Sequence, residues 1–393
     1  MITPAYSPTA TERVLPRMAL DFTTAALDPR VTVTRALNTA TRINSSGLVQ
    51  LVNADLPRFD FDPITKACKG LLIEESRINI QVQSEDFSTT WVATGISVST
   101  NSTTAPDGNA TADTLTASAS PGNIVHLQAV GNGTTYAFSL FVKKLTSDTV
   151  QINFSNVAAG PVFTFSTETF STVASWTTSF QKLDNGWYRI TATRASNTTF
   201  AGMQIRIANS GEAIYAWGAQ MEAGAFATSY IPTTTTSLTR NNDIVSMTGA
   251  NFSDWYNASG GSFVFEGSAL STLGFAYLVL ASDNTNTNRF GAYKSGAAVS
   301  GLVTSSGGTQ MEITGSPIVA NVPFKMAVAA QANSGNFSFN GSIGTNDTTI
   351  VMPTVSQLTI GSFQNLSPLN GHARAVRYYL PRLINAELQA FSK

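Results

Sequence analysis

The chain has few charged residues. Only 12% of its 393 residues are Asp, Glu, Lys or Arg, which is about half the usual share of ~25%. The formal net charge of −1 gives no field that would attract nucleic acid or an anionic membrane surface. We therefore expect neither nucleic acid nor a membrane among the partners.

Cysteine and histidine are also scarce. The single cysteine, Cys68, excludes an internal disulfide framework and a multi-cysteine zinc site. The two histidines, His126 and His372, leave few groups for general-base chemistry or metal ligation. We expect a protein that is not an enzyme and that holds no cofactor and no metal.

Long apolar runs are missing as well. No window approaches the roughly 18 consecutive apolar residues of a membrane span. The N-terminus lacks the basic patch followed by an apolar run that marks a secretion signal. We expect a protein that is soluble when it is made.

The chain is rich in short alternations of apolar and polar residues, bounded by Gly, Asn, Ser and Thr, and this pattern is typical of strands. Clear examples are residues 135–144, 149–156, 186–194, 203–209, 261–270, 275–282, 324–331 and 336–342. Asn-Gly pairs such as 185–186 and 340–341 favour tight reversals. Only "NAELQAF" (385–391) predicts a helix, with Asn385 as its cap. The predicted fold class is all-β: two antiparallel jelly-roll-like sandwiches in tandem, preceded by an extended N-terminal docking region.

The predicted organisation has four parts. Residues 1–82 form the docking and oligomerisation region, 83–235 a first β-sandwich, 236–243 a polar linker, and 244–393 a second β-sandwich. Six prolines interrupt every element of residues 1–82, so this region is expected to be extended and only partly paired. Its apolar pieces should then bury against partner chains or the first sandwich. We expect a chain that starts at residue 83 to stay folded while losing its oligomeric state.

Aromatic residues gather in "YAWGAQMEAGAFATSY" (215–230). Strand alternation puts Tyr215 and Trp217 on one face, where large rings form a core. Trp187 and Tyr188 in "NGWYRI" are expected to cover the end of a sandwich core. The alternative in both places is a ring that stacks on a sugar.

A carbohydrate site is predicted at "DWYNASGG" (254–261). Asp254, Trp255, Tyr256 and Asn257 stand together in an expected loop before two glycines. They offer a ring for stacking and polar groups for sugar hydroxyls. On this interpretation, removing the Trp255 ring would cost little stability.

Two further groups are open to interpretation. Asp283, Asn284, Asn286 and Asn288 supply oxygens suited to a weak calcium site, although a single carboxylate favours a solvated turn. His372 could pair with Asp347 or Glu387, although a satisfied surface histidine is the simpler interpretation. A glycosidase would need two acids facing each other across a cleft, and no such pair is evident in the sequence.

Several segments resemble, in order, a family of tailed-phage and prophage virion proteins described as tail fibres or carbohydrate-binding structural proteins. These segments begin with "LDFTTAALDPRVTVTRALN" and continue through "RFDFDPITKACKGLLIEESRINI", "SEDFSTTW", "TAPDGNATADTL", "NGWYRI" and "YAWGAQMEAGAFATSYIPTT". Together they cover roughly residues 20 to 240. The C-terminal "LTIGSFQNLSPLNGHARAVRYYLPRLINAELQAF" resembles the last strands and terminal helix of concanavalin A-like or laminin-G-like modules.

The resemblance implies a non-enzymatic virion fibre or adhesin, made in the host cytoplasm and placed on the surface of the phage particle. Residues 1–82 would contact capsid, baseplate or tail proteins. The resemblance also implies that the sandwich at 83–235 is carbohydrate-binding-module-like and the one at 244–393 concanavalin A-like and lectin-like, and that both contact host-surface polysaccharide. Fibres of this kind are commonly trimers, so a homotrimer is implied here too. The alternatives are a capsid decoration or head fibre protein that mainly stabilises the particle, and a glycan-degrading tailspike-type enzyme.

Overall fold

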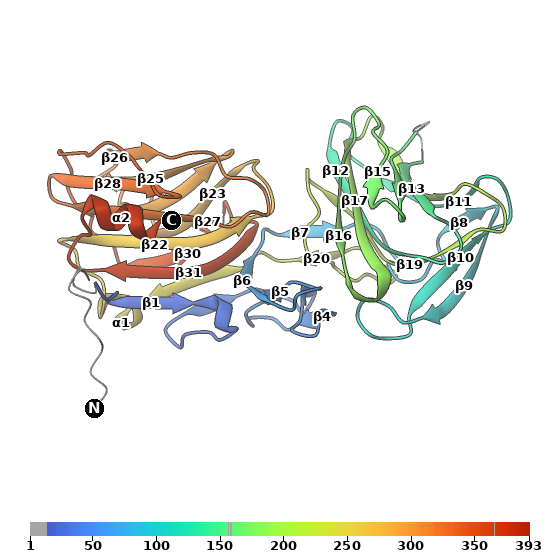
Figure 1. The fold of residues 1–393 in the computed structure, drawn as a ribbon, viewed down its shortest axis with the longest axis horizontal. Helices are drawn as coiled ribbons and strands as arrows, with labels where there is room; N and C mark the ends of the chain where they lie inside the picture. Colours follow the sequence, from blue (N-terminus) through green and yellow to red (C-terminus); the bar gives the residue numbers. More distant parts are fainter. Residues whose placement is uncertain (1–13, 156, 158, 365) are drawn as a thin grey trace. The chain divides into compact units, whose positions relative to one another are not determined.

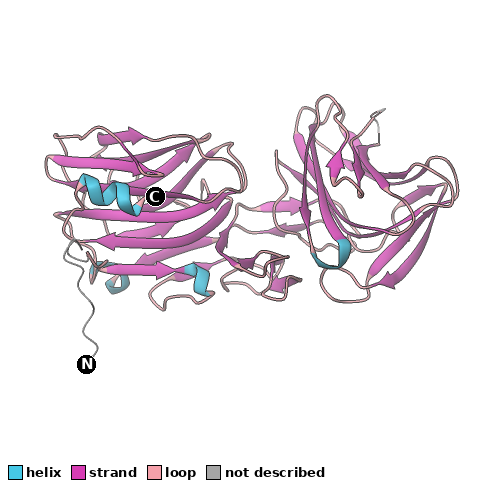
Figure 2. Ribbon diagram, viewed as in Figure 1, coloured by secondary structure: helices cyan, strands magenta, loops and turns pink. Residues whose placement is uncertain are grey.

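The structure is a computed structural model that describes residues 14–393 except residues 156, 158 and 365. The chain divides into two compact units (Figure 1). Unit 1 comprises the chain up to Thr32 together with Ile244–Lys393, and unit 2 comprises Val33–Asp243. Strands dominate both units, and the helical pieces are short (Figure 2). Within the described residues, no helix combines the length and the apolar character needed to cross a membrane.

Unit 1 is built from two antiparallel sheets. In the first, the strand order is β29-β28-β27-β22-β31, and β1 pairs with the other side of β31. In the second, the order is β21-β30-β23-β24-β25-β26. The strands of the first sheet are β1 (Met18–Asp21), β22 (Gly260–Ala269), β27 (Phe324–Gln331), β28 (Ser334–Phe339), β29 (Ser342–Ile343) and β31 (Gly371–Tyr379). Those of the second are β21 (Ile244–Thr248), β23 (Phe275–Ser282), β24 (Arg289–Ser295), β25 (Ala298–Ser305), β26 (Gly308–Thr314) and β30 (Gln357–Ile360).

The core of unit 1 lies between these sheets, where Phe263 of β22 meets Phe290 of β24 with ring centroids 5.2 Å apart. Helix α2 (Asn385–Phe391) covers the opposite face of the first sheet, where Leu388 packs with Val264 and neighbouring apolar residues. The predicted C-terminal helix is therefore confirmed. The N-cap residue differs from the expectation: it is Ile384, not Asn385. The backbone N–H of Ile384 donates a hydrogen bond to the Glu387 carboxylate at 2.8 Å. The remaining helical pieces of unit 1 are η1 (Phe22–Thr24) and α1 (Ala250–Ser253).

Unit 2 contains a second pair of antiparallel sheets, with strand orders β16-β17-β12-β19-β10-β9 and β15-β14-β13-β18-β11-β8. The first comprises β9 (Ile96–Thr103), β10 (Ala112–Ala117), β12 (Thr135–Lys144), β16 (Thr177–Lys182), β17 (Trp187–Ala195) and β19 (Ala213–Ala223). The second comprises β8 (Val92–Thr94), β11 (Gly122–Ala129), β13 (Thr149–Phe154), β14 (Val162–Thr164), β15 (Thr169–Phe170) and β18 (Phe200–Ile207). Shorter elements precede and follow them: β2 (Thr32–Thr34) at the division, β3 (Ala40–Ile43), β4 (Val49–Val52), β5 (Phe59–Phe61), β6 (Cys68–Ile73), β7 (Arg77–Asn79), η2 (Asp184–Gly186) and β20 (Leu238–Arg240).

The aromatic run at 215–230 belongs to an apolar cluster on the outer face of the first sheet of unit 2, apart from the core between the two sheets. Trp217 is 1% exposed, and its ring lies 4.8 Å from that of Tyr230 and 5.3 Å from that of Phe141. Trp187 at the start of β17 belongs to the same cluster. So does Val49, which the β3–β4 hairpin contributes. The sequence-based assignment of Trp217 and Trp187 to buried positions is confirmed, and the hairpin supplies part of their cover.

Five charged side chains meet in the interior of unit 2: Arg35, Arg58, Glu74, Arg240 and Asp243. We call them the buried charge network. Arg58 donates to the Glu74 carboxylate at 2.7 Å and also to that of Asp243. Arg35 lies 2.9 Å from the Asp243 carboxylate. Arg240 lies 3.2 Å from that of Glu74. All five side chains are at most 2% exposed, so each depends on its partners.

The all-β class with antiparallel sandwiches is confirmed. The described part of residues 1–82 contains η1 and short strands distributed over both units, while residues 1–13 lie outside the described residues. Part of the expected linker 236–243 is strand β20, which pairs with β7. A docking role for residues 1–82 stays a prediction.

Candidate functional site

The segment 254–257, predicted to bind carbohydrate, lies at the end of α1. Trp255 is only 3% exposed. Its ring centroid lies 5.1 Å from that of Phe252 and 5.1 Å from that of Tyr378. Its indole N–H donates to the Asn251 carbonyl at 2.8 Å. The expectation that Trp255 stands exposed in a loop is therefore wrong, because the α1 turn directs the ring into the interior of unit 1.

The other three members of this segment differ in exposure. Tyr256 is half-buried and stacks on Phe252 with centroids 4.7 Å apart. Asp254 is exposed and Asn257 is half-buried. The four residues are therefore adjacent, but the Trp255 ring has no exposed face on which a sugar could stack.

The burial of both rings predicts that Trp217→Ala and Trp255→Ala each lower the free energy of unfolding by about 3–5 kcal/mol, the usual cost of removing a large aromatic side chain from a core. The two rings lie in different units, so denaturant unfolding should show the losses in different transitions if the units unfold separately. A cost below about 1 kcal/mol for Trp255→Ala would restore the exposed-loop interpretation.

The sequence also singled out the Asp283 loop as a weak calcium site or a solvated turn, and His372 as a surface histidine. The Asp283 carboxylate accepts hydrogen bonds from the Thr285 backbone at 2.9 Å and from the Asn288 amide at 2.8 Å, so the loop closes on itself as a turn. His372 is 2% exposed and its Nδ1 lies 3.4 Å from the Ser268 hydroxyl. The expectation of a surface histidine is wrong. Among the described residues, no three His, Cys, Asp or Glu side chains gather into a metal site.

A different group of side chains occupies the outer face of the second sheet of unit 1. We call it the aromatic face; it consists of Phe275, Tyr277, Arg289, Tyr293, Glu312 and Phe363. Phe275 stacks on Tyr293 with centroids 4.9 Å apart, and Tyr277 lies 5.1 Å from both Phe275 and Phe363. Phe275 remains 42% exposed.

Strand register explains why these side chains share one face. Tyr277 lies opposite Tyr293, and Tyr293 opposite Ser300. Successive side chains of a strand point to opposite faces, and Phe290 of β24 already points into the core. Arg289 and Tyr293 lie one and three residues from Phe290, both odd steps, and therefore point outward.

Arginine and glutamate add polar groups to the aromatic face. Arg289 donates to the Tyr277 hydroxyl at 2.7 Å and approaches the Thr304 hydroxyl at 3.4 Å. Its buried Nε–H has no hydrogen-bond partner among the described residues, and the Arg289 side chain forms no ion pair with any of them. The Tyr293 hydroxyl donates to Glu312. Burial, together with this hydrogen bond, raises the pKa of Tyr293, so the phenol stays neutral.

The sequence predicted the strand at 275–282 with the bounds that β23 has, but it did not predict β24 and assigned no site to either strand. The available signal was the repeated spacing of aromatic residues two apart, Phe275 with Tyr277. The pairing of Tyr277 with Tyr293 depends on register between strands, which a single strand does not encode.

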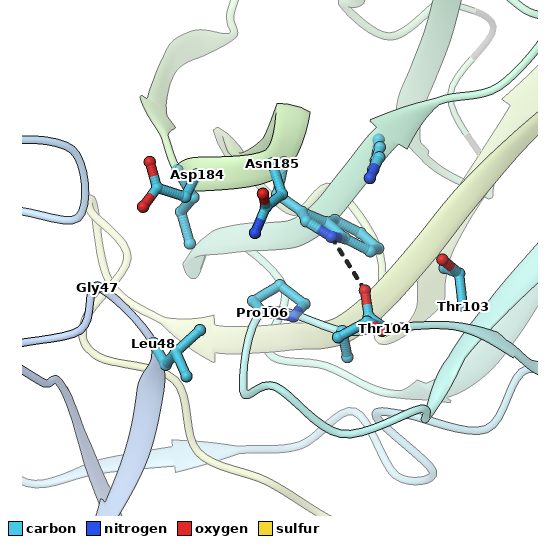
Figure 3. A pocket seen from close by; sticks show the side chains of 11 residues that line it. Gly47, Leu48, Thr103, Thr104, Pro106, Asp184 and Asn185 are labelled. Atoms are coloured by element: carbon cyan, nitrogen blue, oxygen red, sulfur yellow. Dashed lines mark hydrogen bonds between the residues drawn. The ribbon is translucent and has the colours of Figure 1, made fainter.

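Unit 2 has a pocket of about 320 Å³, at the lower end of the ~300–1,000 Å³ of small-molecule sites. Asp184 and Asn185 stand across it from Leu48, Pro106 and Thr104 (Figure 3). The lining residues are Gly47, Leu48, Thr103, Thr104, Ala105, Pro106, Lys143, Leu183, Asp184, Asn185 and Trp187. The Trp187 indole N–H is fixed by donation to the Thr104 carbonyl at 3.2 Å.

The pocket wall contains one carboxylate, Asp184, and that group is paired with Lys66. Asn185 and Gly186 both adopt positive φ, 58° and 78°, as the Asn-Gly signal predicts. This tight turn is what places Asp184 and Trp187 on the same wall. The arrangement offers binding groups and no second acid for hydrolysis.

Comparison with protein-family models finds no match, and comparison with curated proteins finds none either. Among solved structures, the CBM40 module of the Ruminococcus gnavus IT-sialidase bound to α2,3-sialyllactose is 17% identical with a TM-score of 0.30, over 35% of this chain and 84% of that chain. The Streptococcus pneumoniae NanB sialidase is 10% identical with a TM-score of 0.32, over 37% and 26%. The botulinum neurotoxin serotype D binding domain is 9% identical with a TM-score of 0.29, over 38% and 40%. Similarity at this level assigns no function.

Proposed function

We propose that the chain is a non-enzymatic adhesin that binds host-surface glycan through the aromatic face of unit 1. The observation that carries the proposal is Arg289, a half-buried cation without a carboxylate partner among the described residues, which donates a hydrogen bond to the Tyr277 hydroxyl on the aromatic face. The positive charge of its guanidinium suits a sugar hydroxyl or carboxylate. The exposed Phe275 ring suits the apolar C–H face of a sugar.

The absence of a paired acid supports binding over catalysis. Glycoside hydrolysis needs two carboxyl groups about 5–9.5 Å apart. The aromatic face contributes one carboxylate, Glu312, and it is bonded to Tyr293. The pocket of unit 2 also contributes one.

A virion location is part of the same proposal, with residues 1–82 contacting other virion proteins and the chain forming a homotrimer. Its support is the ordered resemblance to phage virion proteins and a set of exposed apolar side chains in the described part of that region. They are Leu15, Leu37, Leu51, Leu56, Ile64 and Ile78. Exposed apolar groups of this kind are suited to contact with other chains.

Binding of the purified protein to host capsular polysaccharide or lipopolysaccharide tests the proposal. Arg289→Ala and Phe275→Ala should each weaken binding at least tenfold, a change of about 1.4 kcal/mol. Phe200→Ala removes a ring from unit 2 that is 56% exposed, and it should leave binding unchanged.

Three results would count against this function. Wild-type affinity in both aromatic-face variants would place the site elsewhere. Progressive shortening of the glycan would favour the tailspike-type enzyme, whereas particle incorporation without any glycan affinity would favour the capsid decoration protein.

A further inference from the structure

The pocket of unit 2 contains a cation that the chain itself does not neutralise. Lys143 lies near the end of β12, lines the pocket and is half-buried. Within the described part of the chain, its ammonium makes no ion pair and no hydrogen bond. Its stem lies over the η2 turn, where a Cβ on Gly186 would come within 3.8 Å of the Lys143 Cε. The turn therefore holds this side chain along the wall.

The other charges of the pocket cancel. Asp184 is paired with Lys66, whose ammonium also donates to the Pro63 carbonyl. Lys66 is fixed behind the pocket, because a Cβ on Gly47 would overlap its Nζ. This leaves Lys143 as the net charge of the cavity, and a partly desolvated cation favours an anionic partner.

The remaining lining sets the class of that partner. Leu48, Pro106, Leu183 and Trp187 form apolar walls that suit the C–H faces of a ring. Thr103, Thr104 and Asn185 add hydroxyl and amide groups that suit hydroxyls. An inorganic anion would use the cation and leave the apolar walls uncovered.

We propose that this pocket binds an acidic sugar residue, with Lys143 as the counter-ion of its carboxylate and the walls enclosing its ring. It is a second site, separate in the chain from the aromatic face of unit 1. The inference rests on the proposed function only in taking a glycan as the source of the acidic sugar.

Titration of the full chain with sodium D-glucuronate, followed by saturation-transfer NMR, tests this site. Methyl β-D-glucopyranoside serves as the neutral probe. Lys143→Gln should weaken glucuronate binding at least tenfold, and added salt should weaken it in the wild type. Lys144→Gln is the matched control, since it removes the same charge from the next residue, whose side chain points to the opposite face and pairs with Asp148 at 2.6 Å.

Thermal unfolding of both variants checks that unit 2 remains folded. The Arg289→Ala variant should bind glucuronate as the wild type does, which separates this site from the proposed glycan site. Equal binding by Lys143→Gln and wild type would overturn the inference. So would equal binding of the neutral probe, absence of glucuronate binding, or its loss in Arg289→Ala alone.

Discussion

Replacing Arg58 with methionine should lower the free energy of unfolding of unit 2 by about 3–5 kcal/mol, the usual cost of removing one partner from a buried ion pair. The Arg58 side chain is fully buried and bridges Glu74 and Asp243. Methionine fills much of the space and supplies no donor. Two buried carboxylates would then lose a charged partner at once, and urea unfolding of the full chain measures the loss.

Lys144→Met is the control for Arg58→Met, because it removes a cation from an exposed pair with Asp148. Exposed pairs contribute about 0–1 kcal/mol, so this variant should unfold almost as the wild type does. Equal losses in the two variants would show that the buried charge network does not hold unit 2 together.

The pH dependence of unfolding gives a second measure of this network. Burial by itself raises the pKa of Glu74, but Arg240, Arg58 and the hydrogen bonds from Ser229 outweigh it and hold that pKa at about 2. A carboxyl whose pKa is lowered by folding stabilises the protein above its unfolded pKa of roughly 4.3. We therefore expect unit 2 to lose this contribution as the pH falls from about 4.3 towards 2.

Local patterns in the sequence were sufficient for strands such as β12, β23 and β27 and for the burial of Trp187 and Trp217. Trp217 sits in an alternating run, and alternation determines which side chains share a face. The NAELQAF segment likewise has good helix formers from position 386 to position 390. These features depend on neighbours in the chain, so the sequence shows them directly.

The arrangement of residues 33–82 depends on contacts between distant residues. Arg35 and Asp243 are 208 positions apart, and Arg58 and Asp243 are 185 apart. No local pattern shows that such charges meet, and clustered charges among prolines are equally typical of an extended arm. The structure instead shows a hairpin and three members of the buried charge network within unit 2.

The candidate sites could be predicted least of all. Trp255 follows Phe252 by three positions, a spacing that puts both rings on one side of a helical turn, and this signal was available. The partnership of Tyr277 with Tyr293 requires the register of two strands. The Lys143 pocket combines a hairpin turn, a loop, a strand and the η2 turn, and their convergence follows only from tertiary packing.

A shortened chain that starts at residue 83 should fail to form a stable unit 2, contrary to the expectation from sequence. The deletion removes Arg35, Arg58 and Glu74 and leaves Asp243 and Arg240 buried without their partners. It also removes the β3–β4 hairpin, whose Val49 packs in the cluster of Trp217. Two buried charges without partners, together with the loss of the hairpin, would cost as much as the total stability of a domain, about 5–15 kcal/mol.

A chain that starts at Val14 is the matched control, because it keeps every contact of the buried charge network and of the hairpin. Near-ultraviolet circular dichroism and urea unfolding of both chains decide the matter. The longer chain should show the unfolding of unit 2 seen in the full chain, and the chain from residue 83 should not. If the chain from residue 83 kept that transition and lost only its oligomeric state, residues 33–82 would act as a docking arm and the buried charge network would be dispensable for folding.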